Sequence, residues 1–192
     1  MKPWYLRRRA RGDRGAVFVE AAFVLPVLLT FVFGIIEFGF GWRDKVTVET
    51  ATRAGARTGS NLGKAAQSDY SVVQTTLSAL GSSVPQSNID MIVVFNANSS
   101  GTIDPTCKSG VGVTNLCNVY LPSTFSLAQS SYTCSGSAPD RFWCETGRVV
   151  AQSSGPDYLG VYIKARHNYL TGIFGSGPLT LESTTVMRLE PG

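Results

Sequence analysis

The feature that most constrains the fold is an apolar run near the N-terminus. Sixteen uncharged residues, AAFVLPVLLTFVFGII, separate Glu20 from Glu37. A helix that begins at Ala16 and ends at Trp42 contains this run and is about 40 Å long at about 1.5 Å per residue. The hydrocarbon core of a bilayer is about 30 Å thick. The sequence therefore predicts a helix over residues 16–42 that spans a lipid bilayer.

Positive charge is concentrated ahead of this run. The chain carries 17 Lys and Arg residues against 13 Asp and Glu, and residues 1–15 hold six of the basic ones but a single acid, Asp13. The six are Lys2, Arg7, Arg8, Arg9, Arg11 and Arg14. Because basic residues mark the cytoplasmic end of a span, they predict a cytoplasmic leader over residues 1–15 and a periplasmic or external location for the rest. Residues 16–192 carry a net charge of −1, which offers no basic surface for nucleic acid.

The four cysteines, Cys107, Cys117, Cys134 and Cys144, all lie in the second half of the chain. They form no CxxC pair, and zinc sites have tighter ligand spacing. We therefore expect no metal centre, and two disulfides formed in an oxidising compartment. Two separations of ten residues make Cys107–Cys117 with Cys134–Cys144 the simplest pairing, while the sequence permits three connectivities.

Downstream of the span, the sequence predicts an α+β architecture. Residues 43–84 continue the helix with a face of small side chains and then form a second helix around QSDYSVVQTTLSALG. Residues 85–192 are predicted to be β-rich, because NIDMIVVFNA, YLGVYIKARHNYL and PLTLESTTVMRLE are β-branched or alternating. Residues 97–157 hold every cysteine and many Gly, Ser and Pro residues, which predicts long loops stapled by disulfides. The expected fold is a long N-terminal helix packed on a small antiparallel sheet of three or four strands.

Motifs for catalysis or cofactor binding are missing from the sequence. We find no Gly-x-Ser-x-Gly and no phosphate-binding loop. The single histidine, His167, falls on the apolar face of a predicted strand, where a buried histidine with a satisfied ring is expected. We therefore expect a non-enzymatic protein without a cofactor.

The boundary between leader and span resembles the signal of type IV prepilins, in which a basic leader ends in glycine and glutamate is the fifth residue of the apolar segment. Gly15, Ala16 and Glu20 occupy these places. In that family a prepilin peptidase cuts on the cytoplasmic side immediately after the glycine, which implies cleavage between Gly15 and Ala16. The segments RGAVFVEAAFVLPVLLTFVFGIIEFGFGW, ETATRAGARTG and YIKARHNYLTGIFGSGPLTLESTTVMRLEP together resemble TadE-like proteins, minor pseudopilins of the tight-adherence, or Flp, pilus machinery. Ala21 stands where major Flp subunits usually carry tyrosine, which favours a minor subunit.

The resemblance implies a pilin-like fold and a role in pilus assembly and surface attachment. The implied partners are the prepilin peptidase, other pilins and pseudopilins, and the inner-membrane pilus platform. Cleavage would create an α-ammonium at Ala16, and Glu20 of an incoming subunit would pair with that group on a neighbour. Such pairing offsets a desolvation cost of several kcal/mol per ion. The alternative role for Glu20 is a solvated carboxylate that favours the dipole at the start of a helix.

Two other functions fit the same pattern. The first is an uncleaved, single-pass adhesin or sensor domain, and the second is a secreted protein whose apolar run is a removed signal peptide. The absence of a small-x-small cleavage site soon after the run argues against the second. Glu37 has two interpretations as well: it marks the periplasmic exit of the span together with Trp42, Arg43 and Asp44, which we favour, or it is a second interface charge.

Overall fold

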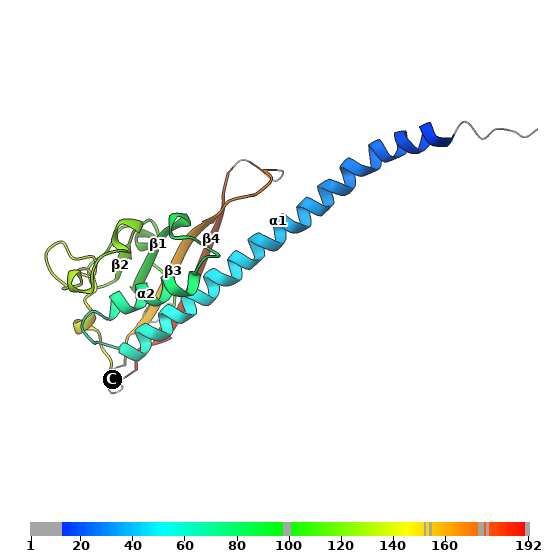
Figure 1. Ribbon diagram of the computed structural model, residues 1–192. Coiled ribbons are helices and arrows are strands. Elements are labelled where there is room, and N and C mark those ends of the chain that lie inside the picture. Colours follow the sequence, from blue (N-terminus) through cyan, green and yellow to red (C-terminus); the bar gives the residue numbers. More distant parts are fainter. Residues whose placement is uncertain are drawn as a thin grey trace, which may run out of the picture.

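The computed structural model describes residues 13–97, 101–151, 153, 155–172, 175 and 177–190. Over these residues the chain forms one long helix that runs beside a four-stranded antiparallel sheet (Figure 1). The predicted α+β class, with two disulfides in the sheet-bearing half, is confirmed.

The long helix, α1 (Asp13–Leu62), is continuous through Pro26 and has two halves that differ in what surrounds them. Residues 15–33 are exposed on all sides, and this half projects away from the sheet (Figure 1). In the described part of the chain, α1 alone is long and apolar enough to cross a membrane. From residue 37 onward, buried positions recur with the helical period. They include Glu37, Asp44, Val48, Ala51, Thr52, Gly55, Ala56, Gly59 and Ser60.

The second predicted helix is α2 (Ser68–Leu80), which packs against the C-terminal half of α1. Small residues on α1 allow this contact to be close. A Cβ added at Gly59 would lie 2.8 Å from a methyl of Leu159 and 3.0 Å from one of Val72. A Cβ at Gly55 would overlap the hydroxyl of Thr76. The thin helix face predicted from TRAGARTG is therefore the face that meets α2 and the sheet.

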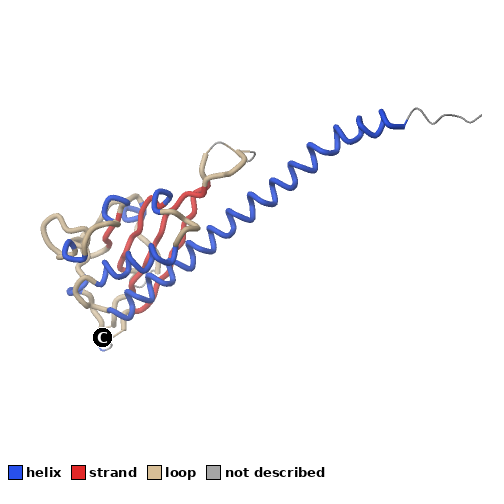
Figure 2. The backbone as a smooth tube through the Cα atoms, viewed as in Figure 1, coloured by secondary structure: helices blue, strands red, loops and turns tan. Residues whose placement is uncertain are grey.

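The sheet has the strand order β2-β1-β3-β4. Its strands are β1 (Ile89–Asn96), β2 (Cys117–Tyr120), β3 (Tyr158–His167) and β4 (Leu179–Arg188). β3 and β4 pair along their whole length, from Tyr158 opposite Arg188 to His167 opposite Leu179. Both helices lie on one face of this sheet (Figure 2).

Alternation along the strands places the core where the pattern predicted it. On β3, Val161, Ile163, Ala165 and His167 are all buried on the face that α1 and α2 cover. On the other face, Met91, Val93 and Phe95 of β1 form a second buried cluster with Tyr162. The Cys107–Cys117 disulfide lies in this second cluster and caps it.

The loop region predicted at 97–157 contains more regular structure than expected. It holds α3 (Pro105–Lys108) and the edge strand β2, which pairs with β1 from Cys117 opposite Phe95 to Tyr120 opposite Ile92. The prediction of loop alone was wrong for these residues. Four strand residues are too few for alternation to stand out, and β2 is defined by the neighbour it pairs with.

Candidate functional site

The N-terminal end of α1 carries the predicted processing residues. Gly15, Ala16 and Glu20 all lie within α1 and are exposed. A Cβ added at Gly15 would meet nothing within 4 Å, so the predicted cleavage point is open on every side. No hydrogen bond or ion pair ties Glu20 to another part of the described chain.

Most of the arginines that predict the orientation of the span lie outside the part of the chain that the structure describes. Arg7, Arg8, Arg9 and Arg11 lie outside the described residues. Arg14 belongs to the first turn of α1, but its side chain is also outside the description. The orientation that these arginines imply stays a prediction.

Where α1 reaches the sheet, Glu37 is buried. Its Oε1 accepts a hydrogen bond from the backbone N–H of Leu170, at 2.5 Å, and its Oε2 has no partner. The favoured interpretation of Glu37 as a marker of the membrane exit stays a prediction, and the burial of its carboxylate is what the sequence did not indicate. The chain that follows β3 covers the carboxylate, and a partner so distant in the sequence leaves no local pattern.

About two helical turns further along, a second buried polar contact ties α1 to β3. The Nδ1–H of His167 donates to Asp44 Oδ2 at 2.8 Å, and Arg43 pairs with Asp44 Oδ1 at 3.1 Å. The expected buried histidine is present, although its Nε2 has no partner. Gly41 lies beside the ring, and a Cβ there would make ordinary van der Waals contact with it at 3.7 Å.

A groove of about 640 Å³ opens between α1 and β4 beside these contacts. Its wall is mostly apolar and includes Phe38, Trp42, Leu179 and Leu181, with Lys45 at one side. The ammonium of Lys45 donates to the backbone carbonyl of Glu182 on β4. The junction thus combines buried carboxylates with an open apolar surface.

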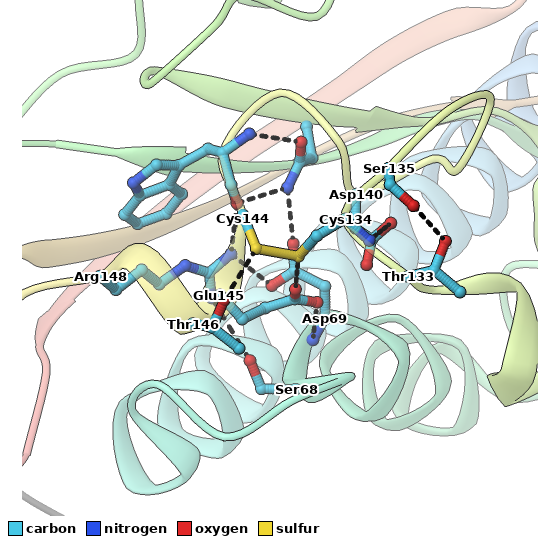
Figure 3. The surroundings of a disulfide bond; sticks show 12 residues. Ser68, Asp69, Thr133, Cys134, Ser135, Asp140, Cys144, Glu145, Thr146 and Arg148 are labelled. Atoms are coloured by element: carbon cyan, nitrogen blue, oxygen red, sulfur yellow. Dashed lines mark hydrogen bonds and ion pairs between the residues drawn. A yellow bond between two sulfur atoms is a disulfide. The ribbon is translucent and has the colours of Figure 1, made fainter.

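A buried ion pair sits at the other end of the domain, around the second disulfide (Figure 3). Asp69 Oδ1 accepts from Arg148 Nη2 at 2.7 Å, and both side chains are fully buried. Asp69 Oδ2 accepts from the amide of Asn118 at 2.9 Å and from the hydroxyl of Tyr120 at 2.6 Å. The Arg148 guanidinium also lies 4.0 Å from the ring of Trp143. The charges are therefore compensated, which is the condition for keeping an ion pair inside a protein.

Glu145 links this ion pair to the disulfide (Figure 3). Burial, reinforced by the negative charge of Asp69, raises the pKa of Glu145 to about 8. At pH 7 the carboxyl is therefore mostly neutral. Its Oε1 accepts from the backbone N–H of Asp69 at 3.2 Å, and its Oε2 lies 2.9 Å from Cys134 Sγ. Because a disulfide sulfur has no proton, the neutral carboxyl is the donor in that contact.

The cysteines pair as Cys107–Cys117 and Cys134–Cys144, which is the simplest of the connectivities that the sequence permits. Cys134, Cys144 and Glu145 come close enough to suggest a metal site. However, a metal binds the thiolate form of cysteine, and both sulfurs here are bonded to each other. The cluster is consequently a structural one. The sequence did not predict its polar members, because Asp69, Glu145 and Arg148 follow no common helical or strand periodicity.

Comparison with known proteins points to the helix rather than to this cluster. Residues 15–57 match the sequence model of a family described as TadE-like protein. Searches of curated proteins and of solved structures gave no match. The resemblance identified from the sequence is therefore confirmed over residues 15–57, which lie within α1.

Proposed function

We propose, on the premise of this TadE-like helix, that the chain is a minor pilin-like subunit of a tight-adherence pilus assembly system. It is inserted in a bacterial inner membrane with its N-terminus in the cytoplasm and its sheet-bearing domain in the periplasm. A prepilin peptidase removes residues 1–15, and the subunit then joins other pilins and the membrane platform through α1. The role supports pilus biogenesis and surface attachment, and no enzymatic activity is assigned.

The exposed half of α1 is the observation that carries this proposal. Residues 15–33 are apolar apart from Glu20 and Thr30 and are covered by no other described part of the chain. Apolar surface costs about 25 cal/mol per Å² in water, so a surface of this size requires a nonaqueous partner. Lipid supplies that partner before assembly, and the helices of other subunits supply it afterwards.

The position of Gly15 suits cleavage. The Gly15–Ala16 bond belongs to the first turn of α1, whose leading N–H groups have no partner within the helix. Opening this turn for a peptidase therefore breaks few hydrogen bonds. The family match also begins at Gly15, and it does not extend into the basic leader.

Cleavage would change the electrostatics around Glu20. The new ammonium at Ala16 stands four residues before Glu20 and so lies on the same side of the helix. In lipid both charges are costly, and each lowers the cost of the other. A neighbouring subunit whose Glu20 reaches this ammonium gains the same benefit, which sets the axial register between adjacent helices.

Mass spectrometry of the mature protein tests the proposal. A chain that begins at Ala16 is expected, whether or not its amine is methylated. A chain that retains Met1 would identify an uncleaved anchor instead. A chain that begins beyond about residue 40 would identify a removed signal peptide and would refute the membrane role of α1.

A further inference from the structure

The depth of Glu37 in the membrane follows from the length of the span. A hydrocarbon layer of about 30 Å takes up about 20 helical residues. Residues 21–42 separate Glu20 from Arg43, so a span that keeps both charges at its edges ends close to Arg43. Glu37 then lies about 9 Å inside that edge, at 1.5 Å per residue.

A carboxylate at that depth must be shielded from lipid by protein, and the end of the β3–β4 hairpin shields Glu37. Charged groups inside a membrane face protein rather than lipid. Glu37 meets this condition, because its side chain is 2% exposed and accepts the N–H of Leu170. The backbone of Leu170 must therefore lie at the same depth as Glu37, below the periplasmic surface of the bilayer.

The hairpin end is apolar on its outer side. Leu170 is 69% exposed and Leu179 is 42% exposed. They stand beside the part of α1 that carries Phe38, which is 73% exposed, and the exposed Trp42. The sequence has no charged residue from Asn168 to Leu181. In Figure 1 the C-terminal end of β3 and the start of β4 point along α1 toward its free half.

We propose that this hairpin surface, formed by Leu170 and Leu179, enters the bilayer beside α1. The domain then contacts the membrane at two places rather than hanging from one helix. The partner is lipid, because the surface is continuous with the lipid-facing side of α1 and lies at a depth where water is excluded. Trp42, beside the groove, is a residue type that accumulates at the membrane interface. The inference rests on the membrane insertion of α1 that is part of the proposed function.

Spin labelling of the full-length protein in phosphatidylethanolamine and phosphatidylglycerol nanodiscs tests the proposal. The native cysteines are all in disulfides, so Leu170→Cys supplies the only free thiol for a nitroxide. The Leu170 side chain is exposed and its contact with Glu37 uses the backbone, so the substitution leaves the fold intact. Tyr158→Cys is the matched control, because Tyr158 is 41% exposed at the opposite end of β3, about 30 Å away. Phe31→Cys reports on the middle of the span, where the Phe31 side chain is 69% exposed.

The measurement is the ratio of relaxation by oxygen, which concentrates in lipid, to relaxation by a water-soluble nickel complex. We expect the ratio at Leu170 to rise above that at Tyr158 toward that at Phe31. A ratio at Leu170 equal to that at Tyr158, with Phe31 in lipid, would overturn the inference and leave the span in place. Water exposure at Phe31 would overturn both proposals. Shielding of Leu170 from both reagents would reveal a protein partner on this surface and would also refute lipid contact.

Discussion

The neutral carboxyl of Glu145 makes stability depend on pH in a defined direction. The pKa of Glu145 rises from 4.5 to about 8 on folding, because burial and the charge of Asp69 oppose ionisation. Below pH 4.5 both the folded and the unfolded chain hold this proton. Between pH 4.5 and 8 the folded chain holds more protons than the unfolded one, so stability falls as pH rises. The whole shift corresponds to at most about 5 kcal/mol.

Glu145→Gln isolates this effect. A glutamine amide copies the neutral acid, since its oxygen accepts from the N–H of Asp69 and its N–H₂ points to Cys134 Sγ. The variant is expected to match the wild type near pH 5 and to be more stable by several kcal/mol at pH 9. The difference in the free energy of unfolding between variant and wild type is taken at each pH. To first order, this difference cancels the contributions of the other titrating groups.

The assay is denaturant unfolding of the full-length protein in detergent, followed by fluorescence at several pH values between 5 and 9. Trp143 stacks on Arg148 in the same cluster and reports on its integrity. A difference between variant and wild type that stays constant across this range would show that Glu145 ionises normally. That result would refute the neutral carboxyl and the hydrogen bond to the disulfide sulfur.

Three further substitutions test separate parts of the structure. Arg148→Met leaves the buried carboxylate of Asp69 without its partner and should lower the free energy of unfolding by about 3–5 kcal/mol. The control, Arg57→Met on the exposed face of α1, should change it by less than about 0.5 kcal/mol. Denaturant unfolding measures both. Gly59→Val should cost about 1–3 kcal/mol in the same assay, because its side chain would overlap α2 and β3. Glu20→Ala should leave membrane insertion intact and reduce piliation, measured by cell fractionation and by counting pili.

Each of these has a result that would contradict it. If Arg148→Met lowers the free energy of unfolding by less than about 1 kcal/mol, water reaches the ion pair. For the glycine, the matched substitution is Gly39→Val, where nothing lies within 4 Å, and equal losses at both sites would remove the argument from close packing. Normal piliation by Glu20→Ala would eliminate the assembly role of that carboxylate.

The parts of the fold that follow from local repeats were predictable. The apolar run predicted the long N-terminal helix, and the alternation from Val161 to His167 predicted both faces of β3. The disulfides also agree with the simplest pairing, because cysteines ten residues apart meet after a short loop closure.

The polar contacts were not predictable, because each joins distant residues that share no period. Asp69 and Arg148 are 79 residues apart, and Glu37 and Leu170 are 133 apart. A sequence shows that Glu37 is an acid in apolar surroundings, but it cannot show which backbone N–H will cover it. The processing residues around Gly15 are the opposite case, since they were found from a motif and a Cβ at Gly15 would meet no other described part of the chain within 4 Å.

The attachment of β4 to α1 also constrains when the domain acquires its structure. The hydroxyl of Ser60 donates to the carbonyl of Arg188, the carbonyl of Ser60 accepts from the N–H of Glu190, and Lys45 bonds to Glu182. These partners are far apart in the sequence, since Ser60 and Arg188 are separated by 128 residues and Lys45 and Glu182 by 137. The inner face of α1 therefore stays uncovered until β4 has been synthesised. Contacts between such distant segments form slowly, so protection of the incomplete domain from aggregation is a requirement of its biosynthesis.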